Sequence, residues 1–421
     1  MTARLFLTFL LLVPFTGTTR AADSRPAGTI ATSFKLLVDT NVYLQSDAAL
    51  AAGQTTPSLP ADASDTVAVA GVNLGWNGQA AAGLKAEASY APEFVRYLHY
   101  RKESYTNHRF ALNVSGKIGD WALEAKNSVL YTDGAKEPLV FNRLGGGPAL
   151  GGEPVRARRA QTITKAGWRL SHPVSGGFVR GVFTLLDQDF HVREKTTAGC
   201  ANYADRREWY AGAEAGWWVR PGFAAIGAVR AGQQTQADLL GVHLNYANTF
   251  TRWLVGVEGS PRSNLKLNLL AGPDVRRYGS AVRAGFDREQ TTTAIESSAV
   301  WTASKTDTLT LGLRRWQWLN GSGRAAYLDL SIDAGWKHTL APGWTFATAA
   351  NLHRGSCTRY NPGSPRDDLI YTGNVSVTHT LSPGTTLEAG VMHDWSDSRV
   401  INAPSREYSR WIVSAGWSRI W

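Results

Sequence analysis

The residue spacing that comes closest to a hydrolytic or metal-binding site is Asp187-x-Asp189-x-His191. On an extended strand, residues two apart point to the same face, so the two carboxylates and the imidazole would lie together. Such a set could activate water or hold a metal ion. However, no partner nucleophile is evident, and Asp and His side chains at strand ends are usually solvated. We therefore expect no catalytic residue, no metal and no cofactor, and keep a hydrolase on the outer rim as the least favoured alternative.

Two adjacent pairs, Ser171-His172 and His393-Asp394, have residue types suited to acid–base chemistry. Neighbouring residues on a strand point in opposite directions, so the members of each pair cannot meet on one substrate atom. Neither pair predicts a catalytic site.

The longest polar segment, 132–159, combines glycine runs with a basic cluster. These residues are Gly145-Gly146-Gly147, Gly151-Gly152, Arg156, Arg158 and Arg159. A phosphate-binding loop would require a Lys-Ser/Thr pair followed by a helix, and both are missing here. The segment could fold inward as a constriction, or it could form a basic outer loop that contacts lipopolysaccharide phosphates.

The elements that must position these residues are segments in which apolar and polar residues alternate. In the clearest one, Leu328 to Leu340, one set of alternate positions is apolar and the other carries Asp329, Asp333 and Lys337. Two further segments alternate in the same way, 109–118 and 371–381. Strands of soluble proteins average about five to six residues. These segments are roughly twice as long and match the 9–11 residues that a tilted strand needs to cross a bilayer.

A sheet in lipid must close on itself, because its edge groups find no water there. The alternation therefore predicts an all-β fold, a transmembrane antiparallel up-and-down β-barrel. The mean hydropathy of -0.22 agrees with half-polar strands, and the 16 Trp could supply interfacial aromatic girdles.

Short turns rich in Gly, Pro, Asn and Asp alternate with longer polar segments. The turns are expected at Asn77-Gly78, Gly119-Asp120, 173–177, Pro221-Gly222, 260–264, 304–307, Pro342-Gly343 and Pro383-Gly384. About eight turns and about nine longer segments connect about 18 strands, within a range of 16–18. In bacterial barrels the short turns face the periplasm, which would place both termini there.

The N-terminus has the pattern of a cleaved export signal. A basic start is followed by an apolar core, Leu5 to Phe15, and by the small-x-small pattern Thr19-Arg20-Ala21. The expected organisation is a signal peptide at 1–21, a short periplasmic segment at 22–33 and a barrel at 34–421. Cys200 and Cys357 lie in segments expected to be loops, and whether they pair is left open.

The last segment alternates toward the C-terminus and places Trp417 and Trp421 on one face. In this it resembles Gram-negative outer-membrane β-barrel proteins, whose last strand commonly ends in an aromatic residue that the barrel-assembly machinery reads. Arg419 departs from that pattern, although an arginine near the interface can snorkel. Within this class the chain looks most like the β-barrel porin type, some members of which are associated with exopolysaccharide export. The resemblance implies a bacterial outer-membrane location, with lipids, lipopolysaccharide and the assembly machinery as partners.

A barrel of about 16–18 strands is wide enough for an aqueous channel. Removing the signal takes away Arg4 and Arg20 and leaves 42 basic against 34 acidic side chains, a balance of about +8 that can attract anions. The pore-lining candidates on the polar faces are Lys35, Arg109, Lys117, Lys126, Arg230, Arg314, Asp329, Asp333 and Lys337.

We therefore expect a porin-like channel that passes small polar or anionic solutes and is not an enzyme. Exopolysaccharide export and a structural or adhesive barrel are the main alternatives. A homo-oligomer or a periplasmic export partner stays open, and a nucleic-acid partner is not expected.

Overall fold

The structure, a computed structural model, describes residues 27–42, 64–81, 83–133, 160–191, 205–237, 244–319, 326–356, 366–400 and 408–421. The signal-peptide prediction, the segment 134–159 and both cysteines lie outside these residues. No helix in the described part of the chain is long and apolar enough to span a membrane.

Eighteen strands form one antiparallel sheet. The first nine are β1 (Ala27–Asp39), β2 (Asp65–Ala81), β3 (Leu84–Tyr97), β4 (Tyr105–Ile118), β5 (Trp121–Asp133), β6 (Ala160–Val174), β7 (Gly177–Phe190), β8 (Arg206–Arg220) and β9 (Phe223–Gln236). The second nine are β10 (Asn248–Arg262), β11 (Leu265–Tyr278), β12 (Glu289–Thr302), β13 (Asp307–Leu319), β14 (Ala326–Ala341), β15 (Trp344–Ser356), β16 (Arg366–Ser382), β17 (Thr385–Val400) and β18 (Tyr408–Ile420).

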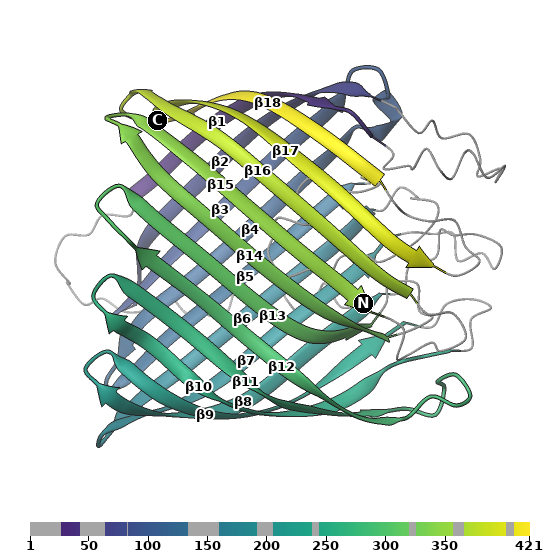
Figure 1. The fold of residues 1–421 in the computed structure, drawn as a ribbon. Helices are drawn as coiled ribbons and strands as arrows, with labels where there is room; N and C mark the ends of the chain where they lie inside the picture. The colour runs from purple at the N-terminus through teal and green to yellow at the C-terminus, as the bar shows by residue number, and fades with distance from the viewer. Residues whose placement is uncertain are drawn as a thin grey trace.

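The sheet closes into a barrel, because each strand pairs with its sequence neighbours and β1 also pairs with β18 (Figure 1). The predicted fold class and the upper end of the predicted strand range are therefore confirmed. All connections of two to four residues lie at one end of the barrel and the longer ones at the other. By the usual orientation of such barrels, the short-turn end is the periplasmic end.

The two faces of the wall differ as the alternation predicts. On β14, Leu328, Leu330 and Ile332 share one face, while Asp329 and Ser331 share the other and are buried. Following the strand register around the ring puts many large apolar residues, among them Phe34, Leu36, Val255 and Trp411, on the outward face at 45–71% exposure. Such a continuous exposed apolar band belongs in lipid, so the barrel spans a membrane.

Two sequence expectations are wrong in position. Asn77 and Gly78 do not form a turn, because they stay in register with Glu87 and Ala86 of β3. The chain reverses instead after Ala81, where Gly83 takes the left-handed φ of +80° that glycine accepts without steric cost.

The first strand also starts earlier than expected. Residues 27–33, assigned to the periplasmic segment, belong to β1, since Ala27 pairs with Asn77 of the long strand β2. Their small side chains hid the alternation, but their backbone groups need partners in the wall.

The C-terminal strand accommodates Arg419 by stacking. The guanidinium of Arg419 lies 3.8 Å from the ring centroid of Trp421, and the Trp421 backbone N–H donates to the carbonyl of Ile30 on β1. Trp417 and Trp421 lie on the outward face. That the assembly machinery reads them stays a prediction.

The seam between the first and last strands carries a buried ion pair at its extracellular end. Arg410 of β18 donates from Nε to Oδ1 of Asp39 at 2.8 Å and from a terminal nitrogen to Oδ2, and both side chains are almost fully buried. Asp394 of β17 lies 4.0 Å from the same guanidinium. The pair therefore ties the two ends of the sheet together.

Replacing Arg410 by alanine is expected to lower the free energy of unfolding by about 3–5 kcal/mol, because it leaves a buried carboxylate unpaired. The control is Arg277→Ala, whose partner Glu289 lies 3.4 Å away with both side chains over 70% exposed. That change should cost about 0–1 kcal/mol. Urea unfolding in detergent micelles measures both, and equal losses would remove the special role of the seam.

Candidate functional site in the barrel interior

The register around the barrel puts all nine sequence-predicted lining candidates on the inward face. They are Lys35 (β1), Arg109 and Lys117 (β4), Lys126 (β5), Arg230 (β9), Arg314 (β13), and Asp329, Asp333 and Lys337 (β14). That they line a conducting pore is a proposal taken up below.

These nine residues are not equivalent, because some are neutralised and others are not. The ion pairs and hydrogen bonds join Lys35 to Glu388 at 2.9 Å, Arg230 to Glu214 and Glu296, Arg314 to Asp329 at 3.5 Å, and Asp333 to Ser331 and Asn351. Within the described residues, Arg109, Lys117, Lys126, Lys337 and Asp333 form no ion pair, because the partners of Asp333 are uncharged. Their charges remain available to a solute.

One sector of the wall, from β7 to β12, holds a chain of buried ion pairs. Glu214 accepts from Arg180 at 2.7 Å and from Arg230 at 2.7 Å. Arg180 also reaches Glu258, and Arg230 reaches Glu296, in each case three strands further on. Removing charges from water costs several kcal/mol per ion unless partners replace the hydration. Here each guanidinium has two carboxylate partners and Glu214 is shared, so every acidic group of this sector lies beside an arginine, while the three glutamates outnumber the two arginines by one charge.

The extracellular half of β13 leaves the wall and leans into the interior. Hydrogen-bonded pairing of β12 with β13 extends only to Ile295 and Arg315. Beyond that point the Arg315 side chain donates to the carbonyl of Thr293 at 2.6 Å, which takes the place of a ladder bond. Gln317 is fully buried and donates to Tyr278 of β11.

The inclined part of β13 reaches strands far away along the sheet. The indole Nε1 of Trp316 donates to both carboxylate oxygens of Glu208 on β8 at 3.1 and 3.2 Å. Gln234 of β9 donates to the carbonyl of Gln317 at 2.8 Å, and Arg206 of β8 donates to that of Leu319 at 2.6 Å. Because β8 and β13 are five strands apart, these bonds cross part of the interior and narrow it. We call this narrowed part, between the inclined end of β13 and strands β8 and β9, the constriction.

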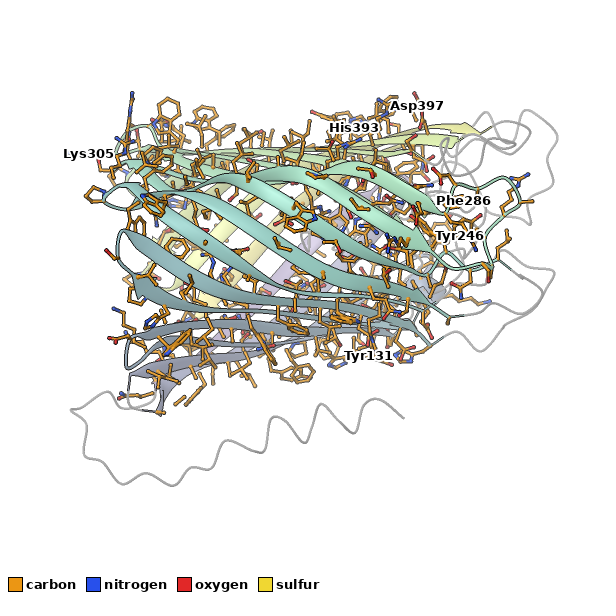
Figure 2. All side chains as sticks on the ribbon, turned by 90° about the horizontal axis from the view of Figure 1, so that it is seen from below. Tyr131, Tyr246, Phe286, Lys305, His393 and Asp397 are labelled. Atoms are coloured by element: carbon orange, nitrogen blue, oxygen red, sulfur yellow. The ribbon has the colours of Figure 1, made fainter. Side chains whose placement is uncertain are left out.

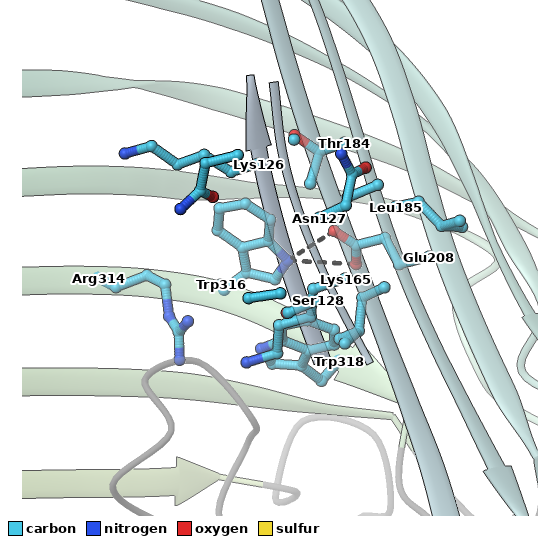
Figure 3. Close-up of a pocket in the computed structure, with 15 residues that line it drawn as sticks. Lys126, Asn127, Ser128, Lys165, Thr184, Leu185, Glu208, Arg314, Trp316 and Trp318 are labelled. Atoms are coloured by element: carbon cyan, nitrogen blue, oxygen red, sulfur yellow. Dashed lines mark hydrogen bonds between the residues drawn. The ribbon is translucent and has the colours of Figure 1, made fainter. Parts of the chain in front are cut away.

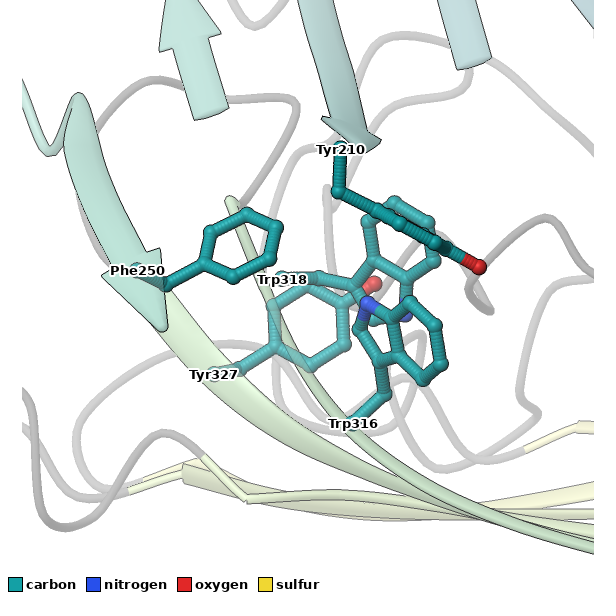
Figure 4. Close-up of a cluster of buried hydrophobic side chains, with 5 residues drawn as sticks. All are labelled: Tyr210, Phe250, Trp316, Trp318 and Tyr327. Atoms are coloured by element: carbon teal, nitrogen blue, oxygen red, sulfur yellow. The ribbon is translucent and has the colours of Figure 1, made fainter. Parts of the chain in front are cut away.

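Five buried aromatic side chains fill the contact between strands β13 and β14 and strands β8 and β10 on the other side of the narrowed interior (Figure 4). They are Tyr210, Phe250, Trp316, Trp318 and Tyr327. Arg252 lies among them with its guanidinium 3.9 Å from the centroid of Trp316 and 4.2 Å from that of Phe250. Its charge is balanced by Asp274 at 3.2 Å, which also binds Arg276. Cation–π contacts and the shared carboxylate hold the inclined strand against the wall.

The described outer segment 279–288 covers the same sector. Phe286 packs edge-on against Tyr246 and Tyr278, with centroid distances of 5.1 and 4.9 Å. The constriction is therefore supported from the extracellular side as well as from within the barrel.

A cavity of about 410 Å³ lies where the inclined strand faces β4 to β8 (Figure 3). Three cations line it, Lys126, Lys165 and Arg314, together with the rings of Trp316 and Trp318. The carboxylate in its lining is Glu208, which already accepts from Trp316 and Gln234. The cavity thus has an excess of positive charge beside an apolar surface.

A second cavity of about 260 Å³ adjoins the first, since Lys126, Gly167 and Thr184 line both. Its other charged lining residues are Glu124, Arg169, Glu214, Arg230 and Glu296. The two cavities therefore lie side by side on the inner wall, next to the inclined part of β13.

Sequence reasoning did not find the pairing of Trp316 with Glu208 or the place of Lys165 in the cavity. Lys165 could have been found from alternation in β6, where Ile163 and Gly167 share its face. The contact of Trp316 with Glu208 joins residues 108 apart in sequence, and no local pattern indicates it.

The carboxylate–histidine set weighed for a hydrolase on the outer rim lies at the extracellular end of β7. Asp187 and Asp189 lie on the outward face of β7, with Asp187 paired to Arg207 at 2.7 Å. His191 contacts Thr162 Oγ1 at 2.7 Å. In the described ranges, no group of three or more His, Cys, Asp and Glu side chains is arranged to hold a metal ion. His393 stacks outward on Trp411 at 4.2 Å.

No protein-family model and no curated protein matches the chain. Similar solved structures include OpdK with vanillate from Pseudomonas aeruginosa, at 12% identity and a TM-score of 0.42, covering 94% of this chain and 99% of that one. Another is OccK2 from the same organism, at 13% and 0.42, covering 93% and 98%. A third is the FrpB iron transporter from Neisseria meningitidis, at 10% and 0.46, covering 95% and 82%. At such identities the function has to rest on this chain's own residues.

The contact of β13 with β9 predicts a crosslink inside the barrel. With the native cysteines replaced by serine, Gln234→Cys combined with Gln317→Cys should be joined by a short bis-maleimide and shift in a denaturing gel. In the control pair, Gln234→Cys with Asn374→Cys, the second cysteine lies on the inward face of β16 and should not be joined. Equal crosslinking of both pairs, or of neither, would contradict the inclined position of β13.

Proposed function

We propose that the protein is an outer-membrane channel through which small polar or anionic solutes diffuse. Support comes from the closed ring of eighteen strands, which is wide enough for an aqueous lumen. The observation that carries the proposal is the cavity at the constriction, where Lys126, Lys165 and Arg314 converge. A solute that crosses the barrel beside the inclined strand passes these three charges.

The preference for anions follows from which charges are already paired. The carboxylates of Glu208, Glu214, Glu258, Asp274 and Glu296 each lie within 4.0 Å of an arginine. Lys126 has no ion pair in the described residues, and Arg314 has one long contact to Asp329 at 3.5 Å. Fixed cations in a narrow, partly desolvated passage raise the local concentration of anions.

The Arg and Trp side chains around the cavity also limit what passes. Trp316 is held by Arg252, 3.9 Å from its ring centroid, and by Trp318, which stacks on it at 5.9 Å. Packed side chains therefore set the width of the passage. We therefore expect the channel to select solutes by charge and size, and not to be an unobstructed pore.

Recordings across planar bilayers test the proposal. In a KCl gradient the refolded mature chain should give open steps whose reversal potential favours Cl⁻. Lys126→Glu with Lys165→Glu should move the reversal potential toward K⁺, because the cavity then repels anions. A folded, heat-modifiable barrel that shows no conductance would refute the channel.

A charge change elsewhere on the inward face provides the matched control. Lys85→Glu and Lys337→Glu alter the same amount of charge near the periplasmic ends of β3 and β14, away from the cavity. Their reversal potential should change much less. If both double variants shift it equally, selectivity belongs to the overall lumen charge and not to the cavity.

The location of the channel implies export through a cleaved signal peptide. The proposal is that cleavage follows Ala21 and that the mature chain begins at Ala22. Intact-mass measurement of the protein from outer membranes should therefore give the mass of residues 22–421. A mass that includes residues 1–21 would contradict cleavage.

A further inference from the structure

The lipid-facing side of the barrel contains a groove that the channel function does not use. It has a volume of about 690 Å³ and runs across β11 to β15. The outward residues that line it are Leu265, Ala299, Trp301, Leu309, Leu311, Ala334, Trp336, Thr348 and Ala350.

The groove exists because small residues occupy a row where their neighbours are large. Ala299, Leu311, Ala334 and Ala350 are opposite one another on successive strands, so three of the four positions in this row carry only a methyl group. In the next row toward the short turns, Trp301 and Trp336 are 47% and 39% exposed and form the walls. Leu311 in the alanine row and Leu309 between the two tryptophans are 51% and 37% exposed, so the floor consists of these leucines together with the alanines.

The periplasmic end of the groove carries positive charge. Arg262 and Asn264, at the turn between β10 and β11, line this end directly. Arg262 points outward, because the register shift near the end of β10 places it opposite Leu265. Within the described part of the chain it forms no hydrogen bond or ion pair. Lys305, in the exposed turn between β12 and β13, lies at the same end of the barrel (Figure 2).

A carboxylate also lies near this end but is already bound. Asp307 accepts from Ser304 Oγ at 2.6 Å, from Trp336 Nε1 at 3.0 Å and from Thr306 Oγ1 at 2.9 Å, and it contacts His338 Nδ1 at 2.8 Å. These contacts hold Asp307 on the Trp336 side of the groove. Arg262, on the β10 side, has no such partner.

We propose that this groove binds one anionic glycerophospholipid of the periplasmic leaflet. An acyl chain lies in the groove between Trp301 and Trp336, against the alanines and leucines of its floor, and the head-group phosphate accepts hydrogen bonds from the guanidinium of Arg262. The apolar surface and the terminal cation match the two parts of such a lipid, in that order from the membrane interior to the interface. A second copy of the chain would instead have to bury Arg262 without an evident acidic partner in the groove.

Native mass spectrometry of the barrel extracted from outer membranes tests the assignment. After delipidation, phosphatidylglycerol added in detergent should bind at one site per chain, and phosphatidylcholine should bind more weakly. Arg262→Gln removes the charge-assisted hydrogen bond and should weaken phosphatidylglycerol binding by about tenfold. Ala334→Leu with Ala350→Leu fills the floor and should abolish the site while the barrel stays heat-modifiable.

The control is Arg277→Gln, which removes an exposed arginine from the outward face at the extracellular end of β11. It should leave phosphatidylglycerol binding unchanged. Equal binding by wild type and both groove variants would overturn the proposal, as would a stable dimer that the leucine substitutions dissociate. Channel conductance should not change in the groove variants, so the outcome is independent of the proposed transport.

Discussion

The structure depends on the requirement that backbone N–H and C=O groups inside a membrane find partners within the protein. Strands satisfy this only when the sheet has no free edge. The pairing of β1 with β18 meets the requirement, and the buried Arg410–Asp39 pair secures it at the extracellular end. Among the described strands, β12 and β13 have a ladder that ends before both strands do, toward the extracellular side. There the side chain of Arg315 on β13 donates to the carbonyl of Thr293 on β12, which is beyond the end of the ladder with β13.

This local departure shapes the interior. Once β13 leaves its neighbour, its inward side chains need partners, and those available belong to β8, β9 and β10. The Trp316 indole donates there to Glu208, and the backbone carbonyls of Gln317 and Leu319 accept from Gln234 and Arg206. The carboxylates of that wall are thereby used for structure, bound by arginines and an indole. In the cavity beside the inclined strand, Lys126 forms no ion pair within the described residues, so the packing that narrows the lumen also leaves a positive charge at this cavity.

Much of the fold could be predicted from the sequence because a membrane barrel repeats one local rule. Long strands with a two-residue period located Asp329, Asp333 and Lys337 on one face, and turns such as Pro221-Gly222 and Pro342-Gly343 separated the strands where expected. The rule failed where local chemistry was ambiguous. Asn77-Gly78 has turn-forming residues, yet its neighbours could continue the ladder, and only the pairing with β3 decides between the two.

The constriction could not be predicted in the same way. Arg252 and Trp316 lie 3.9 Å apart between the guanidinium carbon and the ring centroid. The local pattern reverses at this end of β13, with Trp316 at an inward position and Arg315 and Gln317 at outward ones, but it does not indicate which strand Trp316 meets. The contact of Arg252 with Trp316 depends on how far β13 inclines, which is a property of the closed sheet. The outward groove is similar, since Ala299, Ala334 and Ala350 come together only through the register.

The central claim is that one face of each strand meets lipid and the other meets a water-filled lumen. A cysteine scan along β14 tests it most directly, with single cysteines from Asp333 to Thr339, beyond the buried Asp329 and Ser331, in a chain without native cysteines, reconstituted in vesicles. A charged, membrane-impermeant thiol reagent should modify the odd-numbered positions, whereas spin labels at the even-numbered positions should show contact with oxygen in the lipid. Uniform protection of the odd-numbered positions, or reaction without a two-residue period, would contradict the account.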